Sequence, residues 1–289
     1  MALQLPSFLL LLCNFYRPSH LEENESSTEH LVLLATLRLI YLQLLQPLQQ
    51  ERSDLSMKKI VILTGAGVSA ESGIATFRDS NGLWENHRVE DVASPEGFAH
   101  DPELVLDFYN QRRAQLHTVQ PNEGHRLIAA LEAEYDVTVV TQNIDDLHER
   151  AGSTNIIHLH GELLKARPAE GEGLIVDCPG DLKLGDTNDE GVQMRPHIVW
   201  FGEAVPEIEN AASVVLQADL IIIVGTSMQV YPAAGLVGYA DDSVPVIYID
   251  PKPTINHELK RRGNIHTIEM GGGEGMKVAR GMISKLIGA

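Results

Sequence analysis

The sequence has 289 residues, of which 44% are hydrophobic, and a formal net charge of −18. This composition is typical of a globular chain with one large domain or two modest ones, and it excludes wholesale disorder. The acidic balance argues against direct nucleic-acid binding, because phosphate groups require a basic surface. Two cysteines, Cys13 and Cys178, are too few for a disulfide framework, which indicates a reducing, cytoplasmic compartment.

Residues 1–56 differ from the rest because they are rich in leucine and contain none of the 24 glycines. Residues 8–12 are apolar but lack a preceding basic residue, and the apolar run at 31–46 is short for a membrane helix. We therefore expect no signal peptide and no membrane partner. Two interpretations stay open: a helical extension, or upstream sequence translated from a misplaced start. Met57, directly before a predicted strand, favours the misplaced start.

From Met57 onward, predicted strands and helices alternate. Apolar, β-branched runs without polar alternation predict strands that are buried on both faces. The predicted strands are residues 60–63, 137–140, 220–224 and 246–249, and the predicted helices are residues 102–116, 123–134, 207–216 and 277–286. This alternation predicts a doubly wound, Rossmann-like α/β fold with a parallel sheet, whose ligands lie outside the carboxyl ends of the strands. Residues 162–198 lack periodicity, and we interpret them as a small module inserted in the domain 57–289.

A glycine-rich loop, residues 65–70, follows the first predicted strand and matches the dinucleotide fingerprint G-x-G-x-x-G/A. A tight strand-to-helix turn explains the same residues equally well. A nicotinamide dehydrogenase would next have a strand that ends in Asp or Glu for the ribose. Residues 74–84 instead predict a polar loop with no strand, which argues against hydride transfer.

Several motifs in the same order resemble those of the sirtuins, the NAD-dependent protein lysine deacylases. The motifs are GAGVSAESGI at 65–74 followed by Phe77-Arg78, TQNID at 141–145, His160-Gly161, FGE at 201–203, GTS at 225–227 and Ile249-Asp250. The resemblance covers Met57 to the C-terminus. It implies NAD as cofactor, acyl-lysine proteins or peptides as partners, and free lysine, nicotinamide and O-acyl-ADP-ribose as products.

The resemblance implies that His160 is the catalytic base, and a neutral imidazole suits a base that works at neutral pH. On a strand, His158 would point to the same face as His160, so periodicity alone does not choose between them. The resemblance also assigns Asn143 to catalysis, although Asn and Asp at this point could equally cap the next helix. The cofactor-binding residues that it implies are Gly65, Ala66, Gly67, Ile74, Phe77, Arg78, Gln142, Asn143, Ile144, Asp145, Gly225, Thr226, Ser227 and Asp250.

Two further segments resemble those that clamp the substrate peptide as an added strand. Their implied contact residues are Phe201, Gly202, Glu203, Val230 and Tyr231. Pairing through the main chain would let such an enzyme accept many peptide sequences.

Tyr109 and Arg112, spaced i, i+3 on a predicted helix, can present to one side. They stand where desuccinylase-like sirtuins carry Tyr-x-x-Arg. A guanidinium fork and a phenol suit an ionised carboxylate, so we expect succinyl- and malonyl-lysine to be favoured over acetyl-lysine. A solvated Arg beside a packed Tyr is the other interpretation of the pair. Arg113 should face elsewhere.

Many sirtuins hold a structural zinc ion with two Cys-x-x-Cys pairs in the small module. Residues 162–198 contain Cys178 alone, and Asp177 and His197 do not complete a tetrahedral-site spacing. We therefore predict no metal.

Two other functions stay open at this point: a non-catalytic sensor of NAD or ADP-ribose, and a protein ADP-ribosyltransferase. His160, Asn143 and Asp145 together favour an enzyme over a sensor, since a sensor needs no base.

Overall fold

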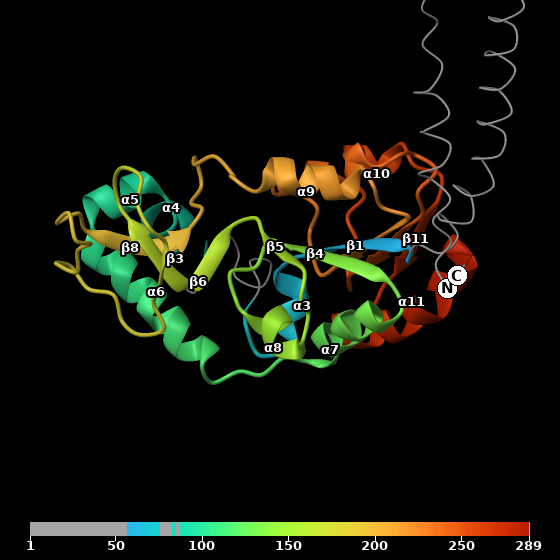
Figure 1. Cartoon of the computed structure of the whole chain (residues 1–289), viewed down its shortest axis with the longest axis horizontal. Helices are drawn as coiled ribbons and strands as arrows, with labels where there is room; N and C mark the ends of the chain where they lie inside the picture. Colours follow the sequence, from blue (N-terminus) through green and yellow to red (C-terminus); the bar gives the residue numbers. More distant parts are fainter. Residues whose placement is uncertain (1–56, 76–82, 85–86, 289) are drawn as a thin grey trace, which may run out of the picture. The chain divides into compact units, whose positions relative to one another are not determined.

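The structure is a computed structural model that describes residues 57–75, 83–84 and 87–288 (Figure 1). The expectations for residues 1–56, and for Phe77 and Arg78, lie outside the described residues and stay predictions.

A six-stranded sheet forms the centre of this part of the chain, with the strand order β11-β10-β9-β1-β4-β5. Every neighbouring pair is parallel. The strands are β1 (Lys59–Thr64), β4 (Asp136–Thr141), β5 (Ile156–His158), β9 (Leu220–Val224), β10 (Val246–Ile249) and β11 (Ile265–Ile268). The four predicted strands are confirmed as β1, β4, β9 and β10. The edge strands β5 and β11 were not predicted, because they are short and mix polar with apolar residues.

Helices cover both faces of this sheet (Figure 1). Successive residues of a strand point to opposite faces, so Ile60 and Ile62 of β1 join one core while Val61 and Leu63 join the other. The first core includes residues of α3 (Ala66–Ala70), α7 (Glu123–Ala130) and α11 (Gly272–Ile287), and the second includes residues of α9 (Ile208–Val215), the 3-10 helix η3 (Ala233–Tyr239) and α10 (His257–Lys260). The doubly wound α/β fold is thus confirmed.

Three of the four predicted helices have different bounds in the structure, and the one predicted at 207–216 is α9, Ile208–Val215. The helix predicted at 123–134 ends as α7 at Ala130 and continues as a 3-10 turn, Leu131–Ala133. The helix predicted at 277–286 begins earlier, at Gly272. Glycine is needed at position 275, because a Cβ atom there would lie 2.1 Å from the Ile249 side chain. The missing side chain of Gly275 lets α11 pack directly on β10.

A second, smaller sheet lies in residues 161–198. It has the order β7-β6-β8 and is antiparallel, with strands β6 (Gly161–Pro168), β7 (Val176–Asp177) and β8 (Met194–Ile198). The helices α4 (Val89–Val92), α5 (Pro95–His100) and α6 (Pro102–Leu116) pack against it through a shared apolar core. The small lobe therefore draws on an earlier segment of the chain as well as on the predicted module.

The predicted loop at 74–84 is corrected at its end, because β2 (Leu83–Trp84) pairs with β3 (His87–Arg88). This two-residue strand does not join the parallel sheet, so the argument against a dehydrogenase is unchanged.

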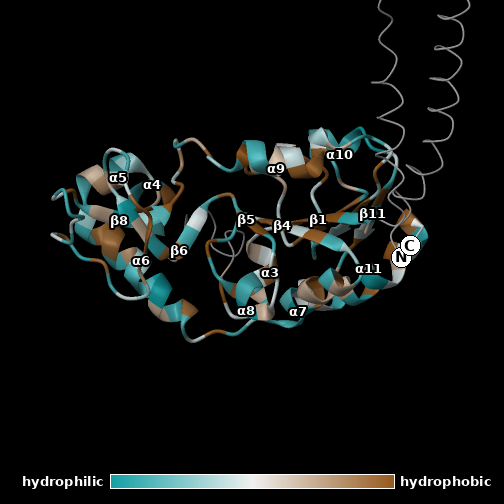
Figure 2. Ribbon diagram, in the orientation of Figure 1, coloured by the Kyte–Doolittle hydropathy of each residue, from teal (hydrophilic) through white to brown (hydrophobic). Residues whose placement is uncertain are grey.

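The helix α6 has the predicted bounds. It begins where the Asp101 carboxylate accepts from the Leu104 N–H at 3.0 Å, with Pro102 in the first turn. Helices carry both apolar and polar residues (Figure 2), as expected for elements that bury one side. Within the described part of the chain, no helix has the length and apolar character needed to cross a bilayer.

Candidate active site

The carboxyl ends of β1 and β9 meet in a junction of glycine backbone. The Gly65 N–H donates to the Val224 carbonyl at 3.2 Å, and the Gly67 N–H donates to the Gly225 carbonyl at 2.7 Å. A Cβ atom on Gly67 would lie 2.7 Å from the Gly225 Cα atom, and backbone atoms cannot move aside for it. Glycine is therefore required where the fingerprint loop passes the end of β9.

Other residues predicted to bind NAD lie at the ends of neighbouring strands. Gln142 follows β4, and its Nε2 atom donates to Thr226 Oγ1 at 3.0 Å. Asp250 follows β10, is 4% exposed, and accepts from the Lys252 N–H at 2.7 Å. The half-buried residues of the predicted NAD-binding set are Ala66, Gly67, Ile74, Gln142, Ile144 and Ser227. The structure thus brings the fingerprint loop, Gln142 and Thr226 together at one edge of the sheet, where α/β proteins bind their ligands.

A buried chain of hydrogen bonds links Asn143, Ser69 and Asp145. Asn143 Nδ2 donates to Ser69 Oγ at 3.0 Å, and Ser69 Oγ donates to Asp145 Oδ2 at 2.9 Å. The three residues are at most 8% exposed. Burial raises the pKa of Asp145 to about 6, so the carboxylate is still ionised at neutral pH and can accept both Ser69 and the Leu147 N–H.

The helix-cap interpretation holds for Asp145 but not for Asn143, because the Asp145 carboxylate accepts from the N–H of Leu147, the first residue of α8 (Leu147–Ala151), at 3.2 Å. The helix α8 begins after Asp146, whose side chain makes no capping bond. Asn143 lies in the loop that precedes the helix, and its side chain donates to Ser69 Oγ instead.

Two buried histidines beside these hydrogen bonds were not predicted from the sequence. His125 Nε2 lies 3.5 Å from Ser69 Oγ, and His148 Nε2 lies 3.1 Å from Thr64 Oγ1. Burial lowers the pKa of His125 to about 4 and that of His148 to about 3, so both rings are neutral at pH 7. A signal was present for His125, because it occupies the third helical position after Asn122, where it completes a capping box.

His160 lies in a turn, because β5 ends at His158. Its Nδ1 atom donates to the Gln142 carbonyl oxygen at 3.0 Å. The His158 Nδ1 atom lies 3.3 Å from the next carbonyl, that of Asn143. The rings of His158 and His160 therefore face the same loop, the one that carries Gln142 and Asn143. Strand periodicity is not the reason, because His160 lies beyond the end of β5. Burial lowers the pKa of His160, which keeps its ring neutral at pH 7.

Tyr109 and Arg112 lie in different surroundings. Tyr109 is 0% exposed, and its hydroxyl oxygen accepts from Trp200 Nε1 at 3.0 Å. Burial raises the pKa of Tyr109, so the phenol stays protonated and keeps its own O–H to donate. The guanidinium carbon of Arg112 lies 4.9 Å from the centre of the Phe108 ring, and its buried Nε atom has no hydrogen-bond partner among the described residues.

The prediction that Arg113 faces away from this pair is wrong for Tyr109, because the two residues are spaced i, i+4 on α6 and the charge of Arg113 acts on the Tyr109 hydroxyl. Arg113 is also buried. It is 1% exposed and donates to the Leu163 carbonyl at 2.9 Å and to Asn110 Oδ1 at 2.7 Å. Asn110 in turn accepts from the Leu182 N–H at 2.9 Å. Arg113 therefore ties α6 to the small lobe, so it is unsuitable as a control for Arg112.

The predicted peptide-clamping segments are exposed at Phe201 (51%), Val230 (37%) and Tyr231 (56%). Glu203 differs from this pattern, because its carboxylate accepts from Arg195 at 2.7 Å and from Arg167 at 3.1 Å. The Glu203 side chain is therefore engaged within the chain, whereas Phe201 of the same segment is exposed.

The small module does not fit a cysteine-ligated zinc ion. Cys178 is half-buried, and its Sγ atom lies 3.6 Å from the Gly180 carbonyl. Within the described residues, neither Asp177 nor His197 joins it in a group of three metal-ligating side chains.

Residues 65–232 match the Sir2 family. The chain belongs to the Sir2 family. It is 52% identical over 227 residues to the NAD-dependent protein deacylase of Bacteroides thetaiotaomicron, which covers 76% of this chain and 96% of that protein.

Solved Sir2 structures have the same fold. A Sir2 homologue in complex with NAD is 38% identical, with a TM-score of 0.70, over 80% of this chain and 91% of that one. A Sir2 protein with a deacetylated p53 peptide and 3′-O-acetyl ADP-ribose is 29% identical, with a TM-score of 0.66, over 80% of this chain and 95% of that one.

Proposed function

We propose that this Sir2 family member is an NAD-dependent protein lysine deacylase that favours acyl groups ending in a carboxylate, such as succinyl and malonyl. Family membership and the name of the Bacteroides relative support the deacylase activity. The observation that carries the proposal is the position of a neutral His160 on the backbone of the loop that contains Asn143. Asn143 is hydrogen-bonded to Ser69, which in turn donates to Asp145.

The glycine junction fits a dinucleotide. Glycine backbone, with no side chains, lies at the ends of β1 and β9. A Cβ atom on Gly65 would lie 2.7 Å from Thr226. Gln142, Thr226 and Asp250 offer polar groups for ribose hydroxyls at the same sheet edge. When bound, NAD would supply a ribose carbon from which nicotinamide departs and to which the acyl oxygen adds.

The chain's own groups would hold and move a proton during this reaction. The His160 Nδ1 proton is held by the Gln142 carbonyl, so Nε2 is free to accept a proton from a ribose hydroxyl. Asn143 is held by Ser69 and cannot rotate without breaking that bond. A preorganised amide of this kind avoids reorganisation during the reaction.

The acyl preference is supported by Arg112 and Tyr109. The guanidinium of Arg112 stacks on Phe108 and keeps an unpaired N–H, while the protonated Tyr109 hydroxyl keeps one hydrogen to donate. A succinyl carboxylate, with a pKa near ~4, is ionised at neutral pH and could accept from both. Charge-assisted hydrogen bonds of this kind are about twice as strong as neutral ones.

A peptide panel with one sequence and different lysine acyl groups, incubated with NAD, tests the proposal. We expect nicotinamide release that depends on the acyl peptide, with kcat/KM higher for succinyl and malonyl than for acetyl. Release without an acyl peptide would instead indicate ADP-ribosyl transfer or NAD hydrolysis. NAD binding without release would indicate a sensor.

A further inference from the structure

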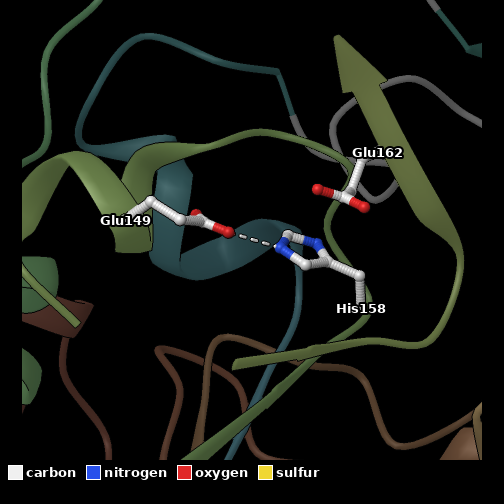
Figure 3. Close-up of side chains that lie close together, drawn as sticks. All are labelled: Glu149, His158 and Glu162. Atoms are coloured by element: carbon white, nitrogen blue, oxygen red, sulfur yellow. Dashed lines mark hydrogen bonds and ion pairs between the residues drawn. The ribbon is translucent and has the colours of Figure 1, made fainter. Parts of the chain in front are cut away.

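Three side chains of kinds that ligate metals lie close together (Figure 3), and one of them, His158, contacts the backbone carbonyl of Asn143. Glu149 lies on α8, His158 ends β5, and Glu162 lies on β6. One donor atom from each residue lies within 4.8 Å of the donor atoms of the other two. No other group of three His, Cys, Asp or Glu side chains in the described part of the chain has this geometry.

His158 has the orientation that histidine ligands usually have. Its Nδ1 atom lies 3.3 Å from the Asn143 carbonyl oxygen, and its Nε2 atom lies 2.6 Å from Glu149 Oε1. A carbonyl only accepts, so Nδ1 carries a proton and Nε2 is the atom that faces the carboxylates. Metal-bound histidines generally donate their second N–H to a carbonyl or carboxylate, which fixes the ring. This bond separates the group from an ordinary exposed cluster of acids.

A cavity of about 150 Å³ is lined by the same three residues. Its wall carries more carboxylates than cations, and the other charged residues that line it are Asp145, Asp146, Asp177 and Lys165. This volume holds an ion with several water ligands.

A proton and an ammonium group neutralise two of these carboxylates in the structure. His158 Nε2 and Glu149 hydrogen-bond directly, and Lys165 Nζ donates to Glu162 Oε2 at 2.9 Å. A divalent cation would replace both, because it balances two carboxylates and uses the same three donor atoms.

We propose that Glu149, His158 and Glu162 bind a Zn²⁺ ion, with water in the remaining coordination position. One imidazole and two carboxylates with an open position suit zinc, whereas Mg²⁺ prefers oxygen donors alone. Spacing within residues 162–198 predicted no metal. The three donors of this site come together only in the folded chain, from α8, β5 and β6.

The test is calorimetric titration of the full chain with zinc chloride, after treatment with a chelator that is then removed. The parent should bind about one Zn²⁺ with release of about one proton, measured in two buffers of different ionisation enthalpy. His158→Gln and Glu162→Gln should each weaken this binding by roughly tenfold or more. Lys165→Met should strengthen it, because the competing ammonium is gone.

Asp177→Asn is the matched control, because it removes a carboxylate from the cavity wall but not from the three donors, and it should bind Zn²⁺ like the parent. Thermal melting without zinc identifies variants that fail to fold. If the parent does not bind Zn²⁺, or if His158→Gln and Glu162→Gln bind it as the parent does, the proposed site is wrong. Equal loss in Asp177→Asn would also overturn it, because the ion would then be held by the general acidity of the cavity.

Discussion

The Nδ1 atom of His160 lies 3.0 Å from the backbone carbonyl oxygen of Gln142. Because a carbonyl can only accept, this contact selects the tautomer whose proton is on Nδ1, and Nε2 is left with its lone pair. The base that the proposed reaction needs is therefore oriented by the backbone that follows β4.

Replacing His160 should separate catalysis from cofactor binding. We expect His160→Tyr to abolish deacylation, since loss of a general base typically costs about 10²- to 10⁴-fold, while NAD affinity stays within a few-fold. Steady-state kinetics and NAD titration of the folded variant measure the two effects. Near-normal turnover would exclude His160 as the base.

The pH dependence of the reaction should reflect the buried base. Because burial lowers the pKa of His160 below 6.5, the ring is neutral above that pH and becomes protonated only below it. We expect kcat/KM to be constant near neutral pH and to fall on the acid side of pH 6.5. Asp145, with a pKa of about 6, titrates in the same region. The acid limb should persist in the residual activity of Asp145→Asn, and an acid limb that is absent from that variant would belong to Asp145.

The sequence predicted the parts of this fold that follow from local pattern. The apolar run of β9 and the capped, proline-initiated α6 are such parts, because burial and helix capping act through neighbouring residues. The start of α11 was predicted too late, because its glycines resemble a break unless their contact with Ile249 is known. That contact joins residues far apart in the chain.

In the candidate site too, local motifs were predictable from the sequence, whereas contacts between distant residues were not. Motifs selected His160, whose ring lies against the Gln142 carbonyl, and Asn143, but the contacts of Ser69 with Asn143 and His125 depend on how α3 and α7 pack together. The burial of Arg113 could not be predicted either, since its partner is the Leu163 carbonyl of another element. Helical spacing shows which way a side chain points, and the neighbouring lobe decides whether it is buried.

The acyl preference should depend on the guanidinium of Arg112. We expect Arg112→Met to lower kcat/KM for succinyl peptide by roughly ten- to a hundredfold while sparing acetyl peptide. Arg112→Lys should recover only part of the loss, because an ammonium lacks the planar fork. The matched control is Arg126→Met, whose side chain is 57% exposed on α7. Equal loss for both acyl groups would show that Arg112 has a structural role.

The glycine junction should not tolerate a methyl group. We expect Gly67→Ala to weaken NAD binding and to lower the melting temperature, because its Cβ atom would lie 2.7 Å from Gly225 backbone. Gly281→Ala is the control, since nothing lies within 4 Å of its Cβ position in α11. That change should stabilise the chain by about 0.5–1 kcal/mol. Thermal melting with and without NAD compares them, and an unchanged Gly67→Ala would contradict the close packing.

The last prediction concerns acid stability and Glu203. Burial alone raises the pKa of this carboxyl, but the hydrogen bonds from Arg195 and the Trp200 N–H, together with the charges of Arg195 and Arg167, outweigh it and hold the pKa below its ordinary value of 4.5. A depressed pKa means that the folded state binds its proton less readily than the unfolded state. The stabilisation is therefore complete above pH 4.5 and is lost as the pH falls through the folded-state pKa.

Glu203→Gln should lower the free energy of unfolding at neutral pH by roughly 3 kcal/mol, because it leaves the 5%-exposed side chain of Arg195 without its carboxylate. The difference between parent and variant should shrink as the pH falls below 4.5, where the parent loses the same charge. Urea unfolding at several pH values measures this difference. Glu134→Gln breaks an exposed pair with Arg280 and should change stability by less than about 1 kcal/mol. A difference between parent and Glu203→Gln that does not depend on pH would show that hydrogen bonding, rather than the charge on Glu203, holds β6 and β8 to this turn.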